Sequence, residues 1–183
     1  MTLTSEPGTG TGTTKITVKE SKFDEDDAYK YLVGTDPTVP DPGDTISDGW
    51  TNWDGDDDIA AETGKTIVVA EVDEDGVVIA VGTAEVAANN TLTVTSVAGT
   101  ETGKTAITVA ETKETGNAYK YKVGTDPTVP EPGDTISGGW TNWDGTAEIT
   151  AETGKTIVVA EVDGSSKVVA VGTAEVVSKE AEE

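Results

Sequence analysis

Apolar and polar residues alternate along this chain in short stretches, with turn-forming residues between them. In one such stretch, Tyr119, Tyr121 and Val123 fall on one face of an extended strand, whereas Lys120 and Lys122 fall on the other. No stretch of useful length has the 3.6-residue period of an amphipathic helix. In the second half of the chain the pattern predicts seven strands, at 92–97, 106–111, 118–123, 139–143, 148–150, 156–162 and 168–176.

The last two strands of each half are predicted to form a hairpin. The loops between them, 73–76 and 163–166, are short, polar and contain glycine, as a tight antiparallel connection requires. Both hairpin strands are apolar on both faces near the turn, which predicts central positions in a sheet. The segments 35–49 and 125–139 are rich in proline and glycine and are expected to be extended surface loops.

The chain is an internal duplication. Residues 28–86 align with 118–176 without a gap, and 47 of the 59 positions are identical. We therefore expect two domains, at 1–88 and 89–183, each near the size of a β-sandwich module. The predicted fold class is all-β, with two tandem immunoglobulin-like β-sandwich domains.

Composition excludes several classes of function. The chain has 35 Asp and Glu against 12 basic residues, all Lys, and a formal net charge of −23. Nucleic acid and anionic membranes are therefore not expected partners. Without Cys or His the chain can form no disulfide, and it offers no thiolate or imidazole ligand for zinc or haem and no Ser-His-Asp triad. We expect a protein that is not an enzyme.

A repeated Trp-Asn-Trp-Asp segment is the candidate binding site. Trp residues three positions apart on a strand point to opposite faces, so one ring is expected in the core and the other outside. The interpretation given more weight is structural, with the outer ring covering the proline-rich loop. The alternative is a platform for a sugar or a protein partner, and its residues are Trp53 and Trp143 with the neighbouring Asn52 and Asn142.

An acidic run in the first half is a candidate calcium site. Asp54, Asp56 and Asp58 stand at alternate positions and offer the oxygen ligands that Ca²⁺ prefers. The second half has Thr146 and Glu148 in place of the last two. A metal essential to the fold should recur in both copies, so a solvated acidic loop is the favoured interpretation, and no cofactor is expected.

The repeated segments also resemble a known class of modules. The pattern G-W-T-x-W, followed by A-E-T-G-K-T-I-V-V-A-E-V-D and A-V-G-T-A-E-V, is similar to tandem β-sandwich repeats of Gram-positive surface proteins. It also resembles decoration modules of phage virions. This resemblance covers roughly two thirds of each copy and implies display, adhesion or reinforcement, without chemistry.

Two functions follow as expectations. The first is a phage head decoration protein on the virion surface, because the sequence begins at Met1 without an export signal. Its partners would be the capsid protein or other copies of itself. The alternative is a tandem-repeat fragment of a bacterial surface-layer or cell-wall adhesin at the bacterial cell surface. Binding of a glycan through Trp53 and Trp143 is compatible with either.

Overall fold

The computed structural model describes residues 1–46 and 48–181 of the chain. The chain divides into two compact units, Met1–Asn89 and Asn90–Glu183. This division falls one residue later than the boundary expected after residue 88. All regular elements in the described residues are β-strands. A search of the same residues for a helix long and apolar enough to cross a membrane finds none.

Within the residues that the structure describes, each unit contains seven strands in the same order. Those of the first unit are β1 (Leu3–Pro7), β2 (Thr13–Val18), β3 (Ala28–Gly34), β4 (Thr51–Trp53), β5 (Ile59–Ala60), β6 (Thr66–Val72) and β7 (Val78–Glu85). Those of the second are β8 (Val94–Ala98), β9 (Lys104–Val109), β10 (Ala118–Gly124), β11 (Thr141–Trp143), β12 (Ile149–Thr150), β13 (Thr156–Val162) and β14 (Val168–Glu175).

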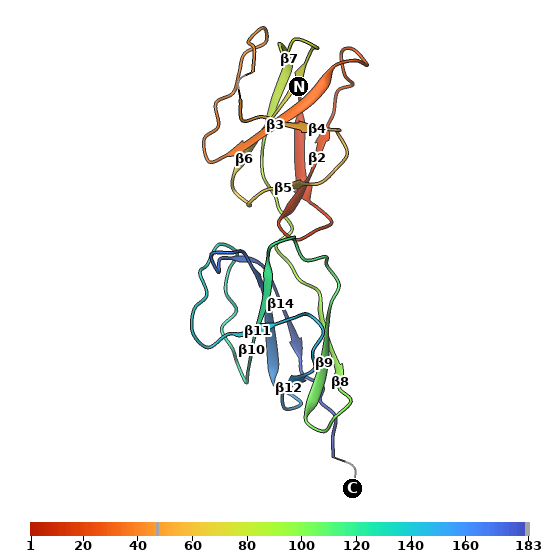
Figure 1. The fold of residues 1–183 in the computed structure, drawn as a ribbon, viewed down its shortest axis with the longest axis vertical. Helices are drawn as coiled ribbons and strands as arrows, with labels where there is room; N and C mark the ends of the chain where they lie inside the picture. The colour runs from red at the N-terminus through yellow and green to blue at the C-terminus, as the bar shows by residue number, and fades with distance from the viewer. Residues whose placement is uncertain (47, 182–183) are drawn as a thin grey trace. The chain divides into compact units, whose positions relative to one another are not determined.

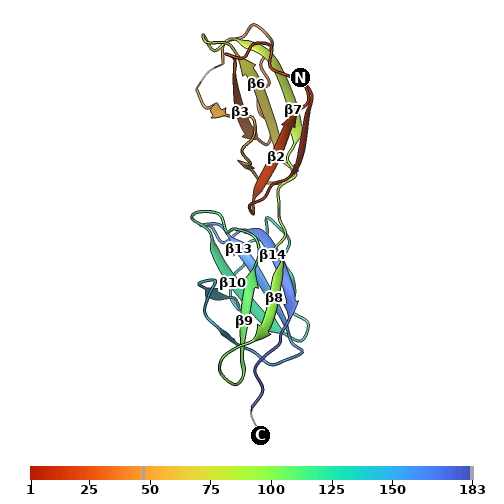
Figure 2. The same cartoon turned by 90° about the vertical axis from the view of Figure 1, so that its right-hand side faces the viewer.

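The strands of each unit form two antiparallel sheets. The first unit has a three-stranded sheet in the order β1-β2-β5 and a four-stranded sheet in the order β4-β3-β6-β7. The second unit repeats this with β8-β9-β12 and β11-β10-β13-β14. Figure 1 shows the strands of both units, and Figure 2 shows β8 and β9 in front of β10, β13 and β14. The predicted all-β fold with tandem β-sandwich domains is confirmed.

The main core of each unit lies between its two sheets. In the second unit Ile107 and Ile149 from one sheet meet Tyr119, Ile157 and Val159 from the other. The corresponding core of the first unit contains Ile16, Ile59, Tyr29, Ile67 and Val69. Complete burial of an Ile or Val side chain contributes about 1.5–3 kcal/mol, so these small clusters are the main source of stability.

The proline-rich loop of each unit covers the outer face of the four-stranded sheet. Ile136 and Trp140 from this loop pack on Val162 and Val168. The backbone N–H of Gly133 donates to the Val168 carbonyl at 2.7 Å, which fixes the loop to the start of β14. As a result β13 is buried on both faces, which explains why its sequence is apolar at successive positions.

The predicted central position holds for one strand of each hairpin only. β13 and β6 lie inside their sheets, whereas β14 and β7 are the last strands in the order, so the expectation for these two is wrong. The outer side of β14 instead receives the segment that enters the second unit. Leu92 N–H donates to the Val171 carbonyl at 3.0 Å, and Val171 N–H donates to the backbone carbonyl of Asn90 at 3.1 Å.

Candidate functional site

The two Trp residues at the ends of β4 and β11 are core residues. Trp53 and Trp143 are 8% and 7% exposed. The Trp143 ring packs against Tyr119 with 5.6 Å between ring centroids, and its Nε1 donates to the Ala147 carbonyl at 2.8 Å. The expectation that Trp53 and Trp143 face outward is therefore wrong. Since β11 pairs Trp143 with the inward-facing Tyr119, the ring enters the space between the sheets.

The other Trp of each pair lies on the opposite side of the four-stranded sheet. Trp140 is half-buried and packs in the cluster formed by Ile136, Val162 and Val168. Trp50 packs in the corresponding cluster of the first unit. The two rings of a pair do point to opposite faces, and the buried ring is the second of each pair, Trp53 or Trp143. The ring outside the main core covers the sheet together with the proline-rich loop.

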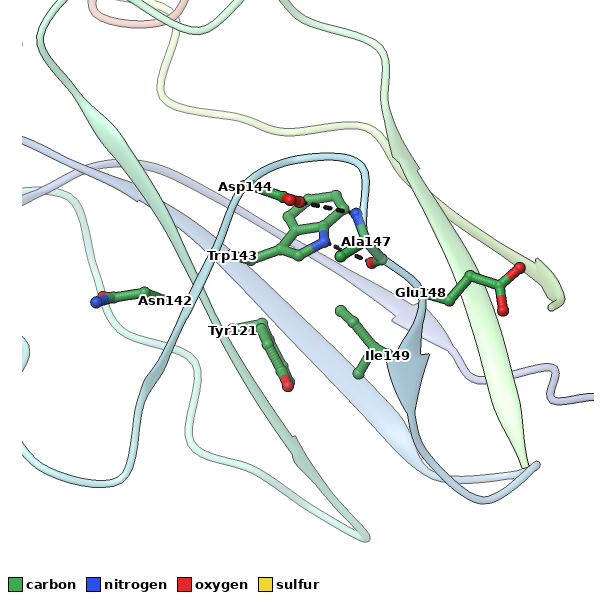
Figure 3. A pocket seen from close by; sticks show the side chains of 7 residues that line it. All are labelled: Tyr121, Asn142, Trp143, Asp144, Ala147, Glu148 and Ile149. Carbon is green, nitrogen blue, oxygen red and sulfur yellow. Dashed lines mark hydrogen bonds between the residues drawn. The ribbon is translucent and has the colours of Figure 1, made fainter. Parts of the chain in front are cut away.

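Asn52 and Asn142 are exposed and lie beside strands β3 and β10, where Asn142 is paired in register with Lys120. Figure 3 shows the Asn142 side chain directed away from the Trp143 ring. This follows from strand geometry, because successive side chains point to opposite faces. The structure therefore does not bring the Asn amide and the Trp ring of either motif together into one binding platform.

A hollow of about 460 Å³ lies beside this segment in the second unit. Its walls include the half-buried Tyr121, the side of Trp143, and Ile149, as Figure 3 shows. Asp144 and Glu148 are also among its lining residues. Figure 3 shows the aromatic and aliphatic side chains of Tyr121, Trp143 and Ile149 near one another, with the Glu148 side chain directed away from them. Binding of a glycan there stays a prediction.

The loop after each buried Trp is held by its first Asp. Asp144 Oδ1 accepts hydrogen bonds from Ala147 N–H at 2.7 Å and Thr146 N–H at 2.8 Å. These two bonds hold the pKa of Asp144 below its ordinary value. Asp54 accepts the same pair of bonds from Asp57 and Asp56 in the first unit, and its pKa is lowered for the same reason.

Asp58, the third candidate calcium ligand, contacts a different loop. Asp58 Oδ2 accepts hydrogen bonds from the backbone N–H and the hydroxyl of Thr9 at 2.6 and 2.7 Å, which lowers the pKa of Asp58. Asp56 is exposed. Among residues 1–46 and 48–181, no group of three or more carboxylates could hold a metal ion. The structure thus engages Asp54 and Asp58 in different loop contacts, and calcium binding by the three residues stays a prediction.

Sequence reasoning missed a buried carboxylate in each unit. Glu161 of β13 has no exposed surface, and its Oε1 accepts hydrogen bonds from Asn117 Nδ2 at 2.7 Å and Glu114 N–H at 2.9 Å. Burial, together with the charges of Glu161 and Glu111, raises the pKa of Tyr119 to about 12. Glu71 is the equivalent residue of β6 and accepts the Phe23 N–H. The sequence did contain an indication of these buried carboxylates, because each Glu lies inside the otherwise apolar run T-I-V-V-A-E-V.

Comparison with known proteins gives a family match over both units. The family model of the S-layer protein SbsC C-terminal domain matches residues 6–89 and again 97–179. A crystal structure of SbsC domains 7, 8 and 9 is 25% identical with a TM-score of 0.43, covering 99% of this chain and 61% of that one. A structure of SbsC domains 4–9 is 26% identical with a TM-score of 0.42, covering 99% and 32%. No curated protein matches.

The chain thus spans less than two thirds of the length of either solved structure. The family match also corrects the first functional expectation. A phage head decoration protein on the virion surface is wrong, because the matched family is that of a surface-layer protein. The match agrees with the alternative, a tandem-repeat fragment of a bacterial surface-layer protein. The interpretation from Met1 failed because the start of a sequence does not identify the route by which a protein leaves the cell.

Proposed function

Because this chain belongs to the S-layer protein SbsC C-terminal domain family, we propose that it is a structural segment of a surface layer on a bacterial cell. The proposed role is non-enzymatic: the chain supplies two β-sandwich modules to the layer. The observation that carries the proposal is the family match, which recurs in both units and leaves little of the chain outside it.

The architecture of the units supports a structural role. Each unit buries an aromatic and aliphatic core between two sheets, and a second apolar cluster forms beneath its proline-rich loop. The residue types that provide nucleophiles with a His base or soft-metal ligands are absent from the sequence. The net charge of −23 favours a well-hydrated outer surface that does not aggregate non-specifically.

Location is the property that tests the proposal. Intact cells of the source bacterium are labelled with a membrane-impermeant biotin reagent that reacts with lysine, and the chain is sought among the labelled proteins by mass spectrometry. Labelling of its Lys residues on intact cells is expected. An abundant cytoplasmic protein serves as the control for lysis. Finding the chain only in the unlabelled cytoplasmic fraction, or only in virions released from the cells, would overturn the proposal.

A further inference from the structure

The two units differ at one edge of the three-stranded sheet. β1 and β8 are equivalent edge strands, with the sequences L-T-S-E-P and V-T-S-V-A. The first unit has Glu6 and Pro7 at the end of this strand, whereas the second has Val97 and Ala98. A charge and a proline on an edge strand are common means of preventing another strand from pairing with it. The second unit lacks both.

The register shows which backbone groups face the open side of β8. Gly99 N–H donates to the Lys104 carbonyl, and the pairing of β8 with β9 continues from there. Because an antiparallel strand alternates its hydrogen-bonding direction, Val94, Ser96 and Ala98 direct their N–H and C=O groups away from β9. In β1 the equivalent of Ala98 is Pro7, which has no N–H to present.

β8 itself carries no charged side chain in a strongly acidic chain, although the carboxylates of Glu111 and Glu148 accept hydrogen bonds from Thr93 and Thr100 just beyond its two ends. Residues 87–100 contain no charged side chain, although the formal net charge of the chain is −23. Val97 is 58% exposed, and it is one of the few large apolar side chains so exposed in the described residues. In the described part of the chain, β9 is the only strand of this sheet that pairs with β8.

We propose that β8 is an interaction edge that pairs antiparallel with β8 of a second copy of this chain. Pairing about Ser96 places Val94 opposite Ala98 and Thr95 opposite Val97, so the strand is complementary to itself in a two-fold arrangement. No charge of either strand opposes a like charge. The two three-stranded sheets then join into one continuous sheet. The pairing of two β8 strands can be tested with the chain alone, whereas a role for this pairing in a surface layer rests on the proposed function.

A second copy fits this edge better than an unrelated extended peptide does. Strongly acidic proteins repel each other, so contact between copies is favoured where the surface carries no charge. Residues 87–100 belong to the longest run without a charged side chain in the sequence, and the carboxylates bonded to this run, those of Glu111 and Glu148, lie at Thr93 and Thr100 outside β8. A wild-type chain that stays monomeric would leave this edge to an extended segment of another protein and would overturn the proposal.

The test exchanges the protective residues between the units. In the full chain, V97E/A98P gives β8 the residues that β1 already carries in the same fold, so this variant is expected to fold. Sedimentation equilibrium over a range of concentrations is expected to show dimers of the wild-type chain and at least a tenfold weaker association of the variant. Thermal unfolding followed by circular dichroism checks that both units of the variant remain folded.

The reciprocal variant E6V/P7A removes the protection of β1 and is expected to add association, giving species larger than dimers. Hydrogen exchange localises the contact: the Ser96 and Ala98 amides should become protected as wild-type chains associate. A wild-type chain that stays monomeric at all concentrations overturns the proposal, as does a dimer that V97E/A98P leaves unchanged. Labelling at the cell surface with a monomeric chain in solution would leave the proposed function standing while this inference fails.

Discussion

Trp143 and Trp140 are only three residues apart, yet each ring has its own apolar surroundings. Trp143 lies between the sheets against Tyr119, and Trp140 lies on the outer face beneath the proline-rich loop. Alternation along a strand predicts that the rings diverge, but it gives no information about which face is inside. Since β11 begins at Thr141, Trp140 belongs to the loop, and only the folded loop shows that its ring also has apolar neighbours.

The two rings should therefore differ in their contributions to stability. Trp143→Ala removes a buried aromatic ring and is expected to lower the free energy of unfolding of the second unit by about 3–5 kcal/mol. Trp140→Ala removes a half-buried ring and should cost about 2 kcal/mol. Urea unfolding followed by circular dichroism measures both, with the unchanged first unit as internal reference. Equal losses, or a larger loss for Trp140→Ala, would contradict the assignment of Trp143 to the core.

Asp58 should give a small, pH-dependent contribution to stability. Its folded pKa lies below the ordinary value of 3.8 because of the Thr9 hydrogen bonds. The contribution is therefore fully present above the unfolded pKa and is lost as the pH falls through the folded pKa. Asp58 is half-buried at the surface of the unit, and solvent screening there limits the contribution to less than about 1 kcal/mol.

Asp58→Asn is accordingly expected to be less stable than the wild type at pH 6, and the difference should shrink below pH 3.8. Urea unfolding at pH 6 and at about pH 3 measures the difference. Asp56→Asn is the matched control, because it makes the same change of charge on an exposed side chain of the same loop. A gap between wild type and Asp58→Asn that is the same at both pH values would disprove the carboxylate contribution.

At the scale of the strands, much of the fold could be predicted from alternation and turn residues. All seven strands predicted for the second unit are present, and β13 has the predicted bounds. The strand predicted at 106–111 lies two residues earlier, as β9, and another difference occurs where one segment serves both sheets. Residues 90–92 first pair with β14, and β8 then joins the other sheet, so the predicted strand at 92–97 starts too early. Side-chain alternation is the same in both sheets and does not reveal this crossing.

Glu161 shows how a strand can fix a loop. Its carboxylate accepts the Asn117 amide and the Glu114 N–H, which joins β13 to the segment before β10. Glu161→Ala leaves these part-buried donors without their acceptor and is expected to cost about 2–4 kcal/mol. Glu161→Gln keeps an acceptor oxygen and should cost about 1 kcal/mol. Urea unfolding of the second unit compares them, and an Ala variant no less stable than the Gln variant would refute this role.

For the whole chain, the net charge is known from the composition, and folding neutralises little of it through ion pairs. Only two ion pairs are present in the described residues, Lys65 with Glu62 and Lys155 with Glu152. Each joins residues that are three positions apart in a turn. Most of the net charge of −23 is therefore left to repel itself in the folded state. The buried cores and sheet hydrogen bonds must overcome this repulsion, which depends on the ionic strength of the solution.

Added salt should consequently stabilise the chain. Raising NaCl from about 0.01 M to about 0.15 M shortens the screening length from about 30 Å to about 8 Å. A gain of about 1 kcal/mol would raise the melting temperature of each unit by roughly 5 °C. CaCl₂ and MgCl₂ at the same ionic strength separate screening from binding. Similar melting temperatures in the two salts indicate screening alone. A melting temperature that is higher in CaCl₂ than in MgCl₂, with the difference abolished by Asp54→Asn, would establish the calcium site of the first unit. A melting temperature that falls as NaCl is added would show that self-repulsion does not limit stability.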